Sequence, residues 1–119
     1  MTLILFLLLL FVGFEHLIFG LVELVGKPEL QAKAFDFSVD DLKNPAVNLA
    51  LRNQGIYNLA FGFLVLYALL GNTPWQVFAG LMAFVVLVGI YGGATVTKKI
   101  YAIQALPALL TFLLLLFIH

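Results

Sequence analysis

Cysteine is absent from the sequence, which excludes disulfide bonds, thiolate nucleophiles and cysteine-ligated metal sites. Charge is scarce as well, because charged residues make up only 10% of the 119 residues, against about 25% in a typical soluble domain. Lysine and arginine together number 6, as do aspartate and glutamate. The chain therefore has no basic surface that would hold the phosphates of a nucleic acid, and a nucleic-acid-binding protein is excluded.

Apolar residues, by contrast, are abundant. They make up 64% of the chain. A soluble protein of this size could not bury so much apolar surface, so a soluble globular protein is excluded. A disordered chain is excluded as well, because such chains have low hydrophobicity. A membrane helix needs about 20 mostly apolar residues, and such stretches run over residues 2–26, 46–70, 75–96 and 100–118. We therefore predict one all-α domain over residues 1–119, an integral membrane bundle of four transmembrane helices arranged up-down-up-down.

The connections between these stretches carry their own signals. Residues 71–74 are typical of a tight hairpin, with Gly71 as a left-handed C-cap and Thr73 as the N-cap of the next helix. The long connection over residues 27–44 mixes charged and apolar side chains, and Ser38 begins a capping-box pattern. We expect this connection to lie as an amphipathic segment on the membrane surface. The alternative is a lid over the mouth of a cavity.

The lysines indicate the orientation. Lys27, Lys33 and Lys43 lie in the first connection, and Lys98 and Lys99 lie in the third. With four spans, these two connections lie on one side of the membrane, which the positive-inside rule makes the cytoplasmic side. We predict a multi-pass protein of the inner (plasma) membrane with both termini outside.

Polar residues inside the spans are the strongest functional signal, because such groups are costly in lipid and often functional. The first span carries Glu15, His16 and Glu23, and helical spacing places His16 and Glu23 on one face together with two glycines. In the second span, Gln54 and Asn58 are four residues apart and share a face. These polar faces must point into the bundle.

The polar residues also share a range of depth. They lie near the midplane or in the lysine-bearing half, whereas the other half is almost purely apolar. We predict that Glu23, Gln54, Asn58, Tyr91 and Gln104 converge on one cavity that is open toward the cytoplasm and closed toward the outside. The candidate ligand-binding residues are Glu15, His16, Glu23, Arg52, Asn53, Gln54, Asn58, Tyr91 and Gln104.

Simpler interpretations exist for each polar group. The amides can serve only as hydrogen-bonding links between helices, each worth about 0.6 kcal/mol. We expect Glu23 to accept a hydrogen bond from Arg52 or an amide, and Glu15 to be the more isolated carboxyl. His16 with its neighbouring carboxyls supplies too few ligands to fix a metal geometry, so no metal or cofactor is predicted.

The last two spans carry packing signals. Gly89 and Gly93 form a G-x-x-x-G pattern, which permits close contact between helices. Pro107 lacks an amide hydrogen and leaves the carbonyl of Ile103 without its helical partner. We expect a kink in the fourth span at this point.

Each span contributes a polar motif, and the four motifs can be compared with known families. They are Glu15-His16 with Glu23, Asn53-Gln54-Gly55-x-Tyr57-Asn58, Gly89-x-Tyr91-Gly92 with Thr95, and Gln104-x-x-Pro107. Together they resemble the pattern of a small bacterial membrane family, domain of unknown function 1304, over nearly the whole chain. The resemblance implies a four-span bacterial membrane protein and brings no established activity. A weaker similarity, in size and number of spans, is to the DoxX-like four-helix proteins.

Three functions fit this pattern. The first is binding or transport of a small molecule or cation, in which Glu15 or Glu23 binds a proton or cation and transport requires a homodimer. The second is a membrane enzyme that acts on a lipid or isoprenoid-like substrate, with the same carboxyls and His16 as acid and base. The third is a structural or partner-binding subunit. The expected partners are the lipid bilayer, a small-molecule or lipid ligand and a second copy of the chain, with no nucleic acid.

Overall fold

Helical segments account for nearly the whole chain in the computed structural model, which describes residues 1–119. In chain order they are α1 (Leu3–Val25), α2 (Pro28–Phe35), α3 (Val39–Leu42), α4 (Pro45–Leu70), α5 (Trp75–Thr95), the π-helical segment η1 (Tyr101–Ala105) and α6 (Leu106–Ile118). Four helices are long and apolar enough to cross a membrane: α1, α4, α5 and the continuous η1–α6 helix. The predicted all-α bundle of four spanning helices is confirmed, and the chain is a multi-pass membrane protein.

The ends of the helices follow local signals in part. The capping box is present, since Ser38 Oγ accepts a hydrogen bond from the Asp41 amide at 3.0 Å and the Asp41 carboxylate accepts one from the Ser38 amide at 3.3 Å. The caps predicted for the hairpin were wrong. Gly71 has a φ of -108°, which is not left-handed, and the Thr73 hydroxyl donates to the Ala68 carbonyl at 2.8 Å. Thr73 thus satisfies a free carbonyl at the end of α4 and does not cap α5.

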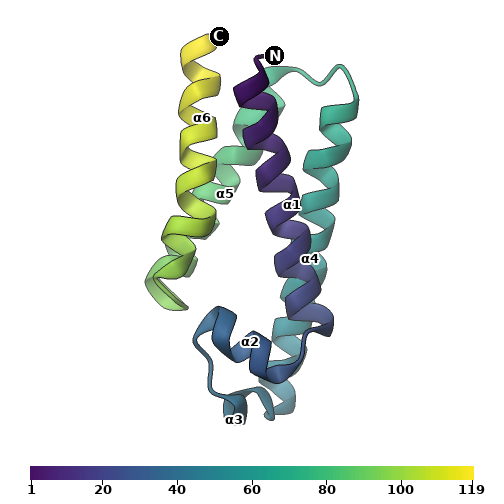
Figure 1. Ribbon diagram of the computed structural model, residues 1–119, viewed down its shortest axis with the longest axis vertical. Helices are drawn as coiled ribbons and strands as arrows, with labels where there is room; N and C mark the ends of the chain where they lie inside the picture. Colours follow the sequence, from purple (N-terminus) through teal and green to yellow (C-terminus); the bar gives the residue numbers. More distant parts are fainter.

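Glycines allow α1 and α4 to pack backbone against backbone (Figure 1). A Cβ atom added to Gly55 would lie 2.8 Å from the carbonyl oxygen of Gly20. One added to Gly62 would lie 2.7 Å from the carbonyl oxygen of Gly13. Only residues without a side chain permit this spacing, which is the usual way for membrane helices to approach closely.

The second helix pair consists of α5 and the η1–α6 helix. Gly89 faces Ala105, and a Cβ atom added to Gly89 would lie 2.9 Å from the Ala105 Cβ. Gly93 faces the ring of Tyr101 in the same way. The close contact predicted from the G-x-x-x-G pattern is therefore confirmed.

The two pairs meet in one apolar core and then separate. The core contains fully buried residues from all four spans, among them Leu9, Val65, Met82 and Ala108. It fills the half of the bundle that carries both termini (Figure 1). Toward the other end, where α2 and α3 lie, the pairs diverge and α4 scarcely contacts α5 (Figure 1). This divergence makes room for the candidate site.

Candidate functional site

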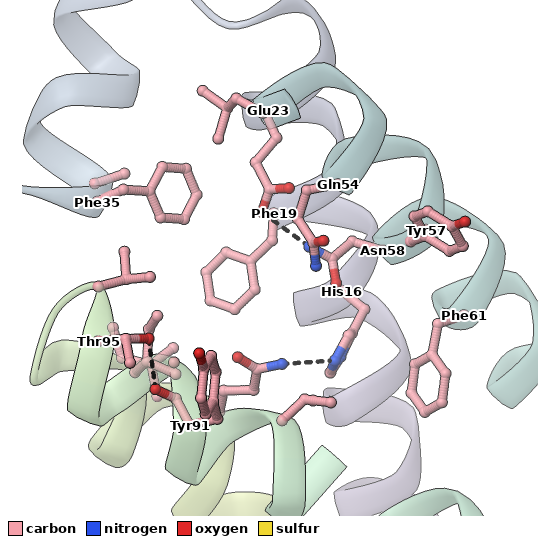
Figure 2. Close-up of a pocket in the computed structure, with 18 of the residues that line it drawn as sticks. His16, Phe19, Glu23, Phe35, Gln54, Tyr57, Asn58, Phe61, Tyr91 and Thr95 are labelled. Carbon is pink, nitrogen blue, oxygen red and sulfur yellow. Dashed lines mark hydrogen bonds between the residues drawn. The ribbon is translucent and has the colours of Figure 1, made fainter. Parts of the chain in front are cut away.

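A cavity of about 950 Å³ lies between the two helix pairs (Figure 2). Its walls come from α1, α2, α4, α5 and η1, and 18 of its 26 lining residues are hydrophobic. Six of the candidate residues lie on these walls: His16, Glu23, Gln54, Asn58, Tyr91 and Gln104. The structure thus brings polar residues from all four spans to one mainly apolar cavity, which is the composition typical of small-molecule sites.

Glu23 is the buried acid of the cavity. It is 4% exposed, and its Oε1 accepts a hydrogen bond from Asn58 Nδ2 at 2.8 Å. The second oxygen, Oε2, is buried and has no hydrogen-bond partner. The expected partner of Glu23 is therefore an amide, whereas Arg52 is exposed and makes no ion pair. The contact between Glu23 and Asn58 is possible because Gly20 and Gly55 hold α1 and α4 so close together.

His16 connects the midplane of α1 with the fourth span. Its Nδ1 lies 2.8 Å from the Val12 carbonyl oxygen, and its Nε2 lies 3.2 Å from the side-chain nitrogen of Gln104 (Figure 2). Since a carbonyl can only accept, Nδ1 carries the proton, and Nε2 accepts a hydrogen bond from the Gln104 amide. This arrangement uses the His16 N–H and one of the two Gln104 N–H groups, and leaves the Gln104 Oε1 free for other partners.

The position of Gln104 depends on an irregular turn. Residues Tyr101–Ala105 form a π-helix, which ends where the Leu106 amide donates to the Tyr101 carbonyl. Pro107 follows directly and cannot supply an amide hydrogen to the preceding turn. The structure accommodates the proline with a wider turn, a device that is common at functional sites, and the kink expected here stays a prediction.

Aromatic side chains close the cavity toward the core. The ring of Phe61 lies 4.8 Å from the His16 ring and stacks on Phe84 of α5 at 5.4 Å, measured between centroids. Beyond these rings lies the apolar core of Leu9, Val12 and Met82. The structure therefore has no polar path from the cavity to the end that carries the termini.

The short helix α2 crosses the lysine-bearing end of the cavity, and its residues Ala34 and Phe35 form part of the wall (Figure 2). Phe35 packs edge-to-face on Phe19, with 6.4 Å between ring centroids. Gln31 is 3% exposed and donates to the carbonyls of Val22 at 2.9 Å and Glu23 at 3.1 Å, so that it caps the end of α1. The helix thus covers this end of the cavity as a lid, and the position of the connection on the membrane surface stays a prediction.

Asp36, directly after α2, holds this lid to the opposite helix pair. It accepts hydrogen bonds from the Thr97 hydroxyl and, at 3.0 Å, from the Lys99 ammonium. Lys99 also donates to the carbonyl of Lys33 at 3.0 Å. The Thr97 hydroxyl, and then Lys99, hold the pKa of Asp36 below its usual value. Sequence reasoning missed this link because the two segments are about sixty residues apart.

The open side of the cavity lies between α4 and α5. Lining residues that are nevertheless exposed mark an opening, and these belong mainly to α4 and α5. Tyr57 on α4 is 66% exposed, and Leu87 and Tyr91 on α5 are 70% and 73% exposed. Both helices are long and apolar enough to span the membrane, so the opening lies between two spanning segments.

Three candidate residues do not reach the cavity. Arg52 and Asn53 lie on the exposed surface of α4. Glu15 is 6% exposed, yet neither of its carboxyl oxygens has a hydrogen-bond partner, and its Oε1 lies 3.7 Å from His16 Nδ1. The structure brings no three His, Asp or Glu side chains close enough to hold a metal ion.

Fold and site together define a four-helix, multi-pass membrane protein with a lateral cavity between its helix pairs. The chain belongs to the family described as protein of unknown function (DUF1304), which matches residues 10–116. It is 29% identical over 83 residues to the uncharacterized protein YpaA of Lactococcus lactis subsp. lactis (strain IL1403), covering 69% of this chain and 70% of that protein. No solved structure matches the chain. The family resemblance noted from the motifs is thereby confirmed.

Proposed function

We propose that this protein binds a small amphiphilic molecule that enters from the membrane between α4 and α5. The polar end of the ligand lies against Glu23, Asn58 and Gln104, and its apolar part lies along the aromatic and aliphatic walls. The observation that carries the proposal is the position of the opening, since it lies between two spanning helices and leads to a mainly apolar cavity.

The energetics favour an occupant of this kind. A mainly apolar cavity gains from burying apolar ligand surface, at roughly 25 cal/mol per Å², while its few polar groups fix the orientation of the ligand. The exposed Gln54 side chain makes no hydrogen bond within the protein, Gln104 keeps a free carbonyl oxygen, and the buried Glu23 Oε2 has no partner. A buried group of this kind is costly unless a ligand or water satisfies it.

The orientation in the membrane is part of the same proposal. The lysine-bearing end, with α2 and α3, faces the cytoplasm of the inner (plasma) membrane, and both termini lie outside. The polar end of the cavity then lies near the cytoplasmic headgroup region, where the polar end of a bilayer amphiphile is also located. The ligand keeps its natural depth as it moves sideways into the site.

Native mass spectrometry of the protein released from its membrane tests the proposal. We expect a bound amphiphile on the wild-type protein whose occupancy falls in Val88→Trp, because Val88 lines the cavity and a tryptophan there takes up part of its space. Ile90→Trp is the matched control, since Ile90 lies on the same helix, is 51% exposed and does not line the cavity. Equal ligand occupancy in both variants, or no bound amphiphile on the wild type, would refute the proposal.

Transport, catalysis and a purely structural role stay predictions. Transport requires a path through the layer of His16, Phe61 and Phe84, and therefore a second conformation or a second copy of the chain. Catalysis requires the bound molecule to leave chemically changed. Comparison of the amphiphile that is bound with the amphiphile that is released separates these two from simple binding.

A further inference from the structure

The charges around the cavity are unbalanced. Glu23 is its one acidic lining residue, and Lys99 is its one lining residue with a permanent positive charge. The Lys99 ammonium is already shared between the Asp36 carboxylate and the Lys33 carbonyl, each at 3.0 Å. Arg52 does not line the cavity. No free cation therefore faces Glu23.

The hydrogen-bonding groups around Glu23 leave several acceptors without partners. Asn58 uses an amide hydrogen on Glu23, and Gln104 uses one on His16. Their carbonyl oxygens remain without partners in the protein, as does Glu23 Oε2. A carboxylate can accept about four hydrogen bonds, and Glu23 accepts one. Each amide also keeps a second N–H donor, but Glu23 Oε2 is a buried acceptor with no partner in the protein.

Aromatic rings border the Glu23 end of the cavity. Phe19 and Phe35 lie beside Glu23, and Tyr91 lies across the cavity (Figure 2). Aromatic faces attract ammonium groups, most strongly where water is excluded. An anionic headgroup would meet the Glu23 carboxyl and no free cation there.

From these three features we infer that the ligand is a lipophilic organic cation, an amine or ammonium compound whose charged group pairs with the Glu23 carboxylate and whose apolar part fills the rest of the cavity. This inference rests on the proposed function and adds the chemical class of the ligand. Phosphate- and carboxylate-bearing lipids are disfavoured, because they would place a second negative charge beside Glu23.

The test uses three fluorescent probes with the same dansyl-bearing alkyl chain, which end in an amine, an alcohol or a carboxylate. Binding is measured to the full-length protein in lipid nanodiscs. We expect the amine to bind at least about tenfold more tightly than the alcohol, and the carboxylate to bind most weakly, because only the amine gains a charge-assisted hydrogen bond at Glu23. Amine and alcohol of equal affinity would overturn the cation inference and leave the proposed function standing.

Glu23→Gln is the critical variant, since it removes the charge and keeps the shape of the side chain. It should weaken amine binding about tenfold and leave alcohol binding nearly unchanged; the retained alcohol binding also shows that the cavity is intact. Glu29→Gln is the matched control, because Glu29 is exposed on α2 and does not line the cavity. Full amine affinity in Glu23→Gln would overturn the inference. If no probe binds the wild-type protein, the proposed function itself fails.

Discussion

Substitution of Gly55 by alanine tests the contact that brings Glu23 and Asn58 together. The added Cβ atom would lie 2.8 Å from the Gly20 carbonyl oxygen and 2.9 Å from the Leu24 nitrogen. Both obstacles are backbone atoms, which cannot rotate away, so α1 and α4 must move apart. Overpacking of this kind costs about 1–3 kcal/mol, against a gain in helix propensity of about 1 kcal/mol. We therefore expect Gly55→Ala to lower the free energy of unfolding by about 2 kcal/mol when the overpacking cost is at its upper end.

Gly80 provides the matched control, because a Cβ atom there meets nothing within 4 Å. Gly80→Ala should gain up to about 1 kcal/mol from helix propensity alone. The two variants should therefore differ by roughly 10 °C in Tm, measured by thermal unfolding in detergent. If Gly55→Ala is as stable as Gly80→Ala, the close contact between α1 and α4 is refuted.

Three further predictions concern single contacts. The pKa of Asp36 is lowered, so its bonds to Thr97 and Lys99 persist through the usual carboxyl titration range and are lost only as the pH falls through the lowered value. Asp36→Asn should therefore raise hydrogen exchange of α2 already at neutral pH. Unchanged exchange would argue against the link between Asp36 and the opposite helix pair. Glu15→Leu should raise Tm, because unpartnered buried oxygens give way to apolar packing; unfolding would contradict this. Gln104→Leu should shift the His16 imidazole signals in NMR spectra, and unchanged signals would exclude the contact between the two side chains.

The spans and the set of polar residues on the cavity wall were accessible from the sequence. Runs of apolar residues predict the spanning helices. Because polar groups are costly in lipid, the polar faces of the four helices are expected to meet inside the bundle. Glu23, Gln54, Asn58, Tyr91 and Gln104 do lie on one cavity for this reason.

The sequence did not show which way each side chain points within its helix, nor which distant segments touch. Helical spacing alone kept Glu15 among the candidates, yet packing turns it away from the cavity. The lid depends on contacts between α2 and distant segments, through Gln31 and Asp36. A weak signal for Gln31 existed, since it lies four residues before Phe35 and shares a helix face with it.

The opening between α4 and α5 was not accessible from the sequence for a related reason. The sequence placed the polar groups by depth and predicted an opening toward the cytoplasm, which stays a prediction. Whether two spans touch depends on the shapes of all four helices, and here the glycines tie α1 to α4 and α5 to η1–α6, which leaves α4 and α5 apart. The opening results from this pairing.

The most direct test of a lateral, ligand-binding cavity is an experimental structure of the protein in lipid nanodiscs without added ligand. We expect elongated density between α4 and α5 that ends in contact with Glu23, Asn58 and Gln104. A cavity that holds only water, or α4 packed against α5 with no space between them, would contradict it.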